Sequence, residues 1–255
     1  MPQHFKVKQL DKLRLQPTVV SMRSGFKLAV VLADASLELV PREVAKHPAI
    51  EKTAKRRGKR PLSMLLDKSL HYHAMKKLPN QEKRGRPDIV HLCLLEVLES
   101  PLCKEGYVQP YIYTIGGLAI RVRGDVRVPK NYNRFVGLME QLLAFSRVPP
   151  QGEPLIEVFG RGLREVVEDF KPDLKVLLSE RGKRMNPLEL ADLLLQRRSM
   201  VLVGAFPHGD FSEEVLKEVD EAVSIYEEVL EGFVAASVVM RALEFKLNLY
   251  GPKQL

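Results

Sequence analysis

Short apolar runs alternate with amphipathic segments through the second half of the chain, and this alternation limits the possible folds more than any other feature. The runs have the length and composition of buried strands, whereas the segments between them carry apolar residues at helical spacing. The predicted strands cover residues 155–159, 175–179, 200–206 and 222–225, and the predicted helices cover residues 187–196, 211–219 and 232–249. Such alternation is typical of a mostly parallel sheet with helices on both faces. We therefore expect an α/β fold.

The first half of the chain extends this pattern less regularly. The apolar run at residues 27–33 predicts a buried strand, and Pro87 suits the first position of a helix that continues to about residue 98. The other expected elements are a helix at 40–57, a strand at 62–66, a polar loop at 71–84, a β-hairpin of residues 107–115 and 118–123, and a helix at 132–144. No repeat or long linker interrupts the 255 residues, so we expect one domain with a basic N-terminal extension, residues 1–23.

Charge is distributed unevenly along the chain. Residues 1–147 contain 27 Lys and Arg against 13 Asp and Glu, whereas residues 148–255 contain 13 against 19. The net charge of +8 therefore hides a strongly basic first half, and residues 52–60 form its densest basic run. Such a half is typical of proteins that bind phosphate-rich partners such as nucleic acids. A solubilising surface of a heat-adapted protein is the alternative, since the chain is rich in Lys, Glu and Arg and contains no Trp.

Several classes of protein do not fit this sequence. No apolar run approaches the roughly 20 residues that a membrane-spanning helix needs, and the N-terminus has no apolar signal-peptide core. Cys93 and Cys103 are the only cysteines, and we expect both to be small core residues rather than a disulfide framework. We expect an intracellular protein without a membrane partner.

The sharpest local motif is the segment Val203–Asp210 at the end of the predicted strand 200–206. Its two glycines flank a turn from strand to helix, where a ligand can approach bare backbone amides, as nucleotide-like ligands require. The spacing matches neither a dinucleotide-binding GxGxxG loop nor a Walker A loop. An ordinary tight turn is the structural alternative.

A second motif combines three cations with polar and aromatic residues between a hairpin and a helix. Arg127, Lys130 and Arg134 are spaced to converge on one patch, and Tyr132 between them suits stacking on an unpaired RNA base. A solvated helix-entry face is the alternative.

The third motif is Arg86-Pro87-Asp88 at the start of the predicted helix. A carboxylate in the first turn is stabilised by the helix dipole, which accounts for Asp88 on structural grounds alone. The functional alternative is a carboxylate paired with Arg86 beside a reaction centre. His71, His73 and His91 raise the question of zinc, but their spacing lacks a fourth ligand, and we expect no metal.

Longer blocks of the sequence resemble a known family. The segments GRPDIVHLCLLEVLESPL, VRVPKNYNRFVGLMEQLL and VGAFPHGDF, in this order, are similar to the pseudouridine-N1-specific methyltransferases of small-subunit ribosome biogenesis, and the similarity covers nearly all of residues 24–248. The resemblance favours an archaeal member. It implies a SPOUT-type fold with a C-terminal trefoil knot at about residues 200–250, a β-hairpin insertion for RNA binding at about 105–130, and a homodimer.

The resemblance also assigns residues to functions. It implies S-adenosyl-L-methionine as cofactor, bound by the backbone of two loops that contain Val203, Gly204, Ala205, Gly209, Ser224, Ile225, Val229 and Leu230. It implies binding of ribosomal RNA by Arg86, Arg127, Lys130 and Arg134, and a catalytic role for Asp88 with Arg86. Lys130 departs from the arginine usual in the family, which keeps the charge but loses bidentate geometry. The segment SIYEEVLEG also departs from the usual loop sequence, which leaves backbone contacts there but not side-chain contacts.

Two functions from different classes are compatible with these residues. The first is N1-methylation of a pseudouridine in a hairpin loop of small-subunit rRNA, in the cytoplasm, or in the nucleolus if the source is eukaryotic. The second is an RNA-binding assembly factor of the nascent subunit, with ribosomal proteins as further partners, whose methyltransferase activity is dispensable. The same basic patch would serve both functions.

Overall fold

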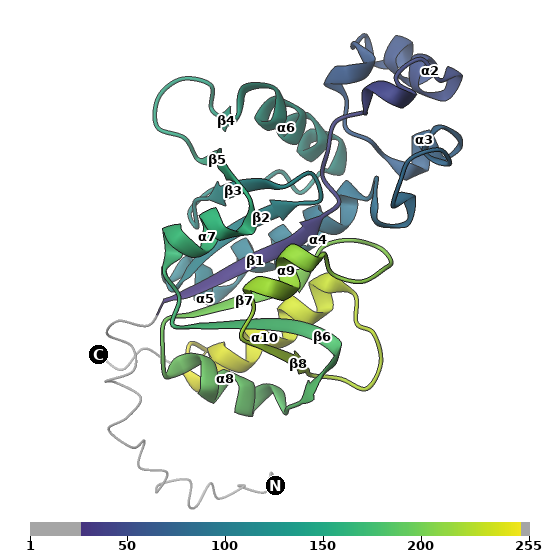
Figure 1. Ribbon diagram of the computed structural model, residues 1–255. Coiled ribbons are helices and arrows are strands. Elements are labelled where there is room, and N and C mark those ends of the chain that lie inside the picture. The colour runs from purple at the N-terminus through teal and green to yellow at the C-terminus, as the bar shows by residue number, and fades with distance from the viewer. Residues whose placement is uncertain (1–26, 251–255) are drawn as a thin grey trace, which may run out of the picture.

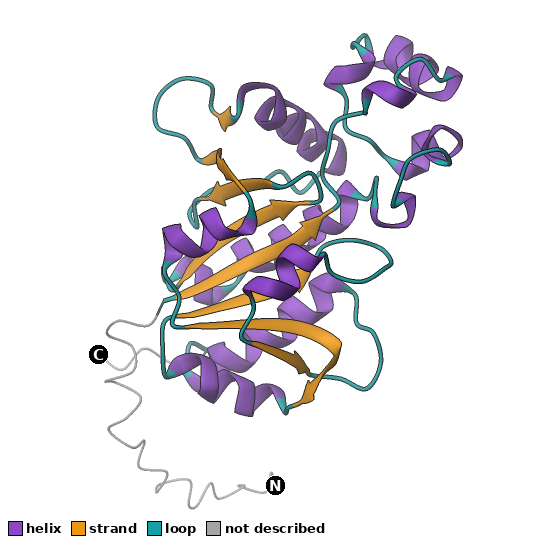
Figure 2. Ribbon diagram, in the orientation of Figure 1, coloured by secondary structure: helices purple, strands orange, loops and turns teal. Residues whose placement is uncertain are grey.

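The computed structural model describes residues 27–250, which build an eight-stranded sheet with helices on both faces (Figures 1 and 2). The order across the sheet is β4-β5-β3-β2-β1-β7-β6-β8. The strands are β1 (Leu28–Ala35), β2 (Val108–Thr114), β3 (Leu118–Val122), β4 (Arg147–Val148), β5 (Ile156–Arg161), β6 (Leu174–Arg184), β7 (Ser199–Gly204) and β8 (Glu221–Ser224). This arrangement confirms the predicted α/β fold. The basic extension predicted at residues 1–23 lies outside the described part of the chain.

Parallel and antiparallel pairings divide the sheet into two parts. The strands β2, β1, β7, β6 and β8 pair in parallel, while β2, β3, β5 and β4 pair antiparallel. The strands β2 and β3 form the expected hairpin, with Ile112 opposite Ile120. Both belong to the central sheet, since β2 also pairs with β1 and β3 also pairs with β5.

The central strand β1 is buried along its whole length because helices cover both faces of the sheet. Its alternate residues Leu28, Val30 and Leu32 join the larger core cluster, while Ala29, Val31 and Ala33 join a second cluster on the opposite face. This two-sided burial explains the nearly continuous apolar run in the sequence.

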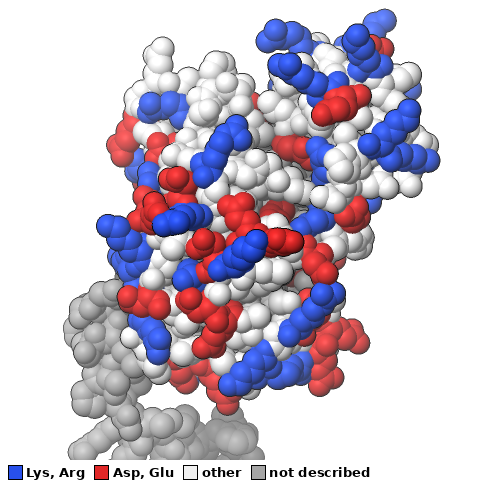
Figure 3. All heavy atoms as spheres, viewed as in Figure 1, with Lys and Arg blue, Asp and Glu red and all other residues white. Residues whose placement is uncertain are grey.

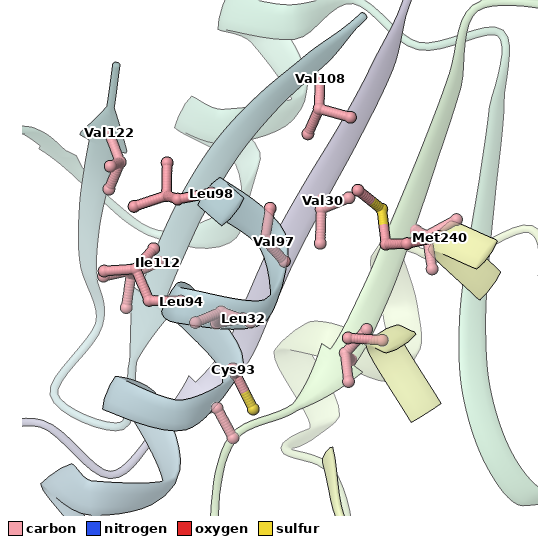
Figure 4. Close-up of a cluster of buried hydrophobic side chains, with 14 of the residues drawn as sticks. Val30, Leu32, Cys93, Leu94, Val97, Leu98, Val108, Ile112, Val122 and Met240 are labelled. Carbon is pink, nitrogen blue, oxygen red and sulfur yellow. The ribbon is translucent and has the colours of Figure 1, made fainter. Parts of the chain in front are cut away.

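The larger cluster packs against helices that lie on one side of the sheet. These helices are α4 (Pro87–Glu99), α5 (Pro101–Lys104), α6 (Tyr132–Phe145), α8 (Pro187–Leu195) and α10 (Gly232–Lys246). Figure 4 shows Val30 and Leu32 of β1 beside Cys93 and Val97 of α4, with Met240 of α10 close by. On the other side lie α7 (Leu163–Phe170) and α9 (Glu213–Glu218). Cys93 and Cys103 are buried free thiols of the larger cluster, which confirms their expected place in the core.

Residues 40–85 form a separate group of helices, here called the helical lobe, which projects from one end of the sheet (upper right in Figure 1). It contains α2 (Pro48–Arg57), α3 (Lys68–Met75) and the short 3₁₀ turns η1 (Arg42–Val44), η2 (Pro61–Ser63) and η3 (Gln81–Lys83). Its apolar residues form their own cluster, which includes Val44, Ile50, Met64 and Met75.

The predictions for this lobe were partly wrong. The helix expected at residues 40–57 begins only at Pro48, because Pro48 occupies the first helical position and His47 caps the helix by accepting from the Ala49 amide. The expected strand at 62–66 is η2 followed by a single bridge between Leu39 and Leu65. The expected loop at 71–84 contains most of α3, whose buried face includes the polar His71. Outside the lobe, the sequence does not predict the short elements α5, α7 and β4.

A buried carboxylate connects the helical lobe to α6. Glu140 of α6 is 3% exposed and accepts two hydrogen bonds from Arg57, at 2.6 and 2.9 Å. It also accepts from the Lys59 ammonium and from the Leu65 amide. Burial by itself would raise the pKa of Glu140, but the hydrogen bonds from Arg57, Lys59 and Leu65 outweigh it and lower the pKa.

This lowered pKa predicts a pH-dependent contribution to stability. A carboxyl group whose pKa is depressed by folding stabilises the protein above its unfolded pKa, and the effect is lost as the pH falls through the folded pKa. Glu140→Gln is therefore expected to reduce the free energy of unfolding by about 1–3 kcal/mol at pH 7, after a discount for the partial exposure of Arg57 and Lys59. Urea unfolding should show this difference shrinking below about pH 4. The control Glu99→Gln, at an exposed carboxylate 3.1 Å from Lys104, should cost less than about 0.5 kcal/mol. Equal losses in both variants would contradict the anchoring role of Glu140.

Between residues 27 and 250, no helix combines the length and apolar character needed to cross a bilayer.

Candidate cofactor and RNA sites

A cavity of about 280 Å³ lies at the carboxyl end of β7, where ligands of parallel sheets usually bind. We call it the loop pocket. One wall is the segment from Val203 to Phe211, a second is Val229–Gly232 at the start of α10, and a third is Leu178–Glu180 of β6. A smaller hollow of about 60 Å³ adjoins it and shares the residues Leu178, Val229 and Leu230.

The structure brings together most of the residues that the sequence assigned to cofactor binding. Those that line the loop pocket are Val203, Gly204, Gly209, Val229 and Leu230, and Ser224 and Ile225 line the adjoining hollow. Ala205 lines neither cavity. Its side chain is fully buried, its amide donates to the Ala33 carbonyl, and its carbonyl accepts from the Ser36 amide, so both backbone groups serve the protein itself.

Two glycines determine how closely the pocket walls approach each other. A Cβ on Gly232 would lie 2.2 Å from the backbone oxygen of Gly204, so α10 can begin here only with glycine. A Cβ on Gly204 would meet only the ends of two aromatic rings, at 3.1 Å from Phe211 and 3.2 Å from Phe206. The close packing of α10 against β7 is thus fixed by Gly232, whereas a Cβ at Gly204 would require the Phe206 and Phe211 rings to shift slightly.

A buried ion pair holds the pocket loop against the helical lobe. The Lys83 ammonium of η3 lies 3.0 Å from Oδ2 of Asp34 and also donates to the Asp210 carbonyl of the pocket loop at 2.5 Å. Asp34 accepts from the Ser212 amide and hydroxyl at 2.6 and 2.8 Å. The ammonium also lies 4.4 Å from the centre of the Phe206 ring, a cation–π contact.

The backbone of Asp34 has a φ of 47°, which is unusual for a residue other than glycine. It follows the apolar stretch of β1 and turns its carboxylate toward the pocket loop. Sequence reasoning missed both Asp34 and Lys83. The one available signal was an isolated aspartate directly after a buried strand.

Arg86 and Asp88 form a side-on ion pair at the start of α4. Arg86 Nε and Nη2 each donate to a different oxygen of Asp88 at 2.8 Å, and the two side chains are 38% and 41% exposed. The hydrogen bonds that Arg86 donates to Asp88 raise the pKa of Arg86, as do the nearby carboxylates of Glu231 and Asp67. Glu231, one of these carboxylates, lines the loop pocket. The Arg86 amide donates to the Ser36 hydroxyl at 2.8 Å, which fixes this turn to the end of β1.

The polar residues of the second motif divide between two roles. The side chains of Arg127, Lys130 and Arg134 are exposed, as an RNA contact requires. Tyr132 is instead half-buried, and its hydroxyl donates to Asp67 at 2.7 Å. Burial and this hydrogen bond raise its pKa. Asn131 caps α6 by accepting from the Arg134 amide.

This segment lies against α4 through His91, whose Nε2 is 2.7 Å from the Pro129 carbonyl and whose ring stacks on Phe135 at 4.2 Å. Arg127 and Lys130 line a cavity of about 830 Å³ together with Lys104 and Glu99.

The histidines raised as zinc ligands have other contacts. Burial lowers the pKa of His71, and its Nδ1 accepts from the Asp67 amide. Across residues 27–250, no three His, Cys, Asp or Glu side chains are grouped as metal ligands.

Comparisons with known proteins agree with this geometry. The sequence profile of the EMG1/NEP1 methyltransferase family matches residues 30–244. The ribosomal RNA small subunit methyltransferase Nep1 of Staphylothermus marinus is 45% identical over 87% of this chain and 97% of its own, and that of Sulfurisphaera tokodaii is 49% identical over 81% and 91%. The crystal structure of Archaeoglobus fulgidus Nep1 bound to S-adenosylhomocysteine is 43% identical and superimposes with a TM-score of 0.78, covering 87% of this chain and 99% of that one. These matches confirm the resemblance seen in the sequence, and the chain belongs to the EMG1/NEP1 methyltransferase family.

Proposed function

We propose that this protein transfers a methyl group from S-adenosyl-L-methionine to N1 of a pseudouridine in small-subunit rRNA. The observation that carries the proposal is a hydrogen-bonded link between the Arg86–Asp88 turn and the loop pocket: the Arg86 amide donates to the Ser36 hydroxyl, and the Ser36 amide donates to the Ala205 carbonyl, next to Gly204 of the pocket wall. A cofactor cradle, a polar pair and a cationic RNA surface therefore occupy neighbouring parts of the molecule. The protein is proposed to act where small ribosomal subunits are assembled, in the cytoplasm. Ribosomal proteins are proposed as further partners.

The loop pocket fits the proposed cofactor. Gly204 presents bare backbone to the pocket, and Gly209, with a φ of 102°, allows the loop to turn around a ligand. Val203, Val229 and Leu230 supply apolar walls for an adenosine group. When bound, S-adenosyl-L-methionine supplies an electrophilic methyl group. A C-terminal knot is part of this proposal. It is supported by the path of the chain, which passes from β8 at the edge of the sheet, beyond β6, back to the end of β7, where Gly232 at the start of α10 lies against Gly204.

The Arg86–Asp88 pair accounts for the chemistry that the chain itself must provide. The N1 atom of pseudouridine carries a proton that must leave as the nitrogen attacks. Asp88 accepts this proton or holds the base by a hydrogen bond, and Arg86 fixes the carboxylate in place. Arg86 is also placed to bind an RNA phosphate, since its side chain is 38% exposed.

The exposed cations of the 127–134 segment are proposed to bind the phosphates of the RNA. Arg127→Ala and Arg134→Ala are each expected to weaken RNA binding and to lower the slope of log affinity against log salt by roughly 0.7 per lost single-strand contact. Fluorescence anisotropy across a salt series measures both quantities, and calorimetry should show that cofactor binding is unchanged. Wild-type affinity and slope in both variants would remove this segment from the RNA surface.

A homodimer is the proposed assembly. Several large apolar side chains are exposed close to the pocket or on the helices α4 and α10, among them Val229 at 75%, Leu92 at 46% and Phe245 at 66%. Light scattering at micromolar concentration should therefore report about twice the 29.0 kDa of one chain. A species of single-chain mass alone would contradict the dimer.

Methyl transfer to two RNA hairpins that differ at one position tests the proposed function. One hairpin carries a pseudouridine in its loop, and the other carries uridine at the same position. We expect transfer to the first only, because uridine is joined to its ribose through N1 and has no N1 proton to lose. Equal transfer to both would contradict N1 specificity. Tight RNA binding without transfer to either hairpin would favour the RNA-binding assembly factor instead.

A further inference from the structure

Four cations of the run at residues 52–60 in the helical lobe have no ion-pair partner in the part of the chain that the structure describes. The run at residues 52–60 contains six Lys and Arg. Arg57 and Lys59 are used by Glu140, whereas Lys52, Lys55, Arg56 and Arg60 are exposed. In Figure 3, Lys and Arg side chains gather over this lobe at the upper right. Like charges gathered without partners repel one another and destabilise the folded chain. Binding of an anionic partner would account for their presence here.

The usual structural explanations cover only part of this charge. Lys55 and Arg56 lie in the last turn of α2, where cations are stabilised by the helix dipole, but by only about 0.3–1 kcal/mol each. Lys52 precedes that turn, and Arg60 lies beyond the helix end. In heat-adapted proteins surface charges are organised in ion-pair networks, which these four do not join.

The anchor at Glu140 places this charge next to the candidate RNA segment. Glu140 and Arg134 are both on α6, so the contacts from Arg57 and Lys59 hold α2 close to that helix. A cavity of about 500 Å³ opens between the two elements. Its lining includes Arg56 and Arg57 from the lobe together with Tyr132 and Asn133 from α6. The cationic surface therefore continues from the 127–134 segment onto the helical lobe.

The same lobe exposes an apolar side chain beside these cations. Leu70 of α3 is 39% exposed. It lines the cavity between the lobe and α6 together with Arg56. Cations beside an exposed apolar side chain suit a single strand, whose phosphates bind the cations and whose bases pack on the apolar surface.

We propose that the lobe surface, defined as Lys52, Lys55, Arg56 and Arg60 with Leu70, binds an unpaired rRNA strand that flanks the methylated hairpin. The cations bind phosphates of this strand, and Leu70 packs against one of its bases. The proposal rests on the function proposed above and adds to it a second contact region on the same RNA. The hairpin loop reaches the pocket, while the flank lies across the lobe.

The test compares two RNAs and two double variants. One RNA is the pseudouridine hairpin alone, and the other carries a single-stranded flank of about ten nucleotides, within the range that single-strand grooves cover. The lobe variant is Lys55→Gln with Arg56→Gln, which leaves Arg57, Lys59 and Glu140 intact. The matched control is Arg164→Gln with Arg197→Gln, which removes the same charge from exposed positions elsewhere. Thermal melts confirm that both variants fold.

We expect the wild type and the control to bind the flanked RNA roughly tenfold more tightly than the hairpin, and the lobe variant to lose this gain. Its salt slope on the flanked RNA should fall by about 1.4, corresponding to two single-strand contacts. Its affinity for the hairpin alone and its rate of methyl transfer to that hairpin should stay at wild-type values.

Two results would overturn the proposal. The first is a wild type that gains nothing from the flank, and the second is a lobe variant that keeps the gain. If a lobe variant that keeps the gain also loses binding to polyglutamate, the lobe is assigned to an acidic protein partner. Failure of the proposed function is distinguishable, because methyl transfer would then be absent on both RNAs in every variant while the flank-dependent gain in binding is still measured.

Discussion

Asp88→Asn is expected to lower the single-turnover rate of methyl transfer by about 100-fold or more, while RNA and cofactor affinities stay within a few-fold of wild type. Asparagine keeps the shape of the side chain and its place in the first turn of α4 but cannot accept the N1 proton. Raising the pH should partly restore the variant, because pseudouridine then loses its proton to solvent. Rates measured from pH 6 to 10 at saturating RNA test this expectation.

The chain offers a matched control for this variant. Arg123 and Asp125 form a second side-on pair two residues apart, with Nε–Oδ1 and Nη2–Oδ2 distances of 2.9 and 2.6 Å. Asp125 lines the cavity that also holds Arg127 and does not line the loop pocket. Asp125→Asn should therefore leave the rate of the chemical step unchanged. A wild-type rate in Asp88→Asn together with a lower melting temperature would show that Asp88 serves only the helix start.

Gly204→Val is expected to reduce cofactor affinity by about 100-fold or more without preventing folding. The new Cβ would press on the flexible ends of Phe206 and Phe211, which can shift, whereas the valine methyl groups would occupy space on the pocket side. Calorimetry with S-adenosylhomocysteine measures the loss, and a thermal melt measures the cost of the substitution.

Gly137→Val provides the comparison for this loss, since a Cβ at Gly137 of α6 meets no atom within 4 Å. It should bind the cofactor normally, with a cost in stability typical of a surface helix position. Gly232→Ala is the opposite extreme, because its Cβ would overlap a backbone oxygen. Wild-type cofactor affinity in Gly204→Val would mean that the turn has a structural role only.

The central sheet could be predicted from the sequence because its strands are buried on both faces. The strand β1 reads as a continuous apolar run, and neither Leu32 nor Val31 faces water. The helical lobe could not be predicted in the same way. It buries His71 of α3 and Lys83 of η3 in place of apolar residues, so that neither segment has a clear apolar periodicity. Pro48 and His47 indicate the start of α2. The prediction placed that start too early because the apolar residues Val40, Val44 and Ala45 extend the helical spacing toward the N-terminus.

The candidate site was visible in the sequence only where its residues are consecutive. Val203, Gly204 and Gly209 belong to one turn, and Arg86 is two residues from Asp88, so each motif could be recognised locally. Asp34 and Lys83 are 49 residues apart, and only the packing of the lobe brings them together. Ala205 was assigned with its neighbours, although a residue within a loop is free to bind a ligand only if its backbone is not already paired.

The contact of Lys83 with the pocket loop has a thermodynamic consequence for the order in which ligands bind. Lys83 is part of the lobe, and its ammonium holds both Asp34 and the Asp210 carbonyl, so the pocket loop and the lobe share one buried charge. A ligand that fixes the loop therefore also restricts the lobe. If the cofactor strengthens RNA binding through this charge by some factor, RNA must strengthen cofactor binding by the same factor, because the free-energy change is independent of the order of addition. The same relation holds for the two products. When either S-adenosylhomocysteine or methylated RNA dissociates, the affinity of the protein for the other product falls by that factor.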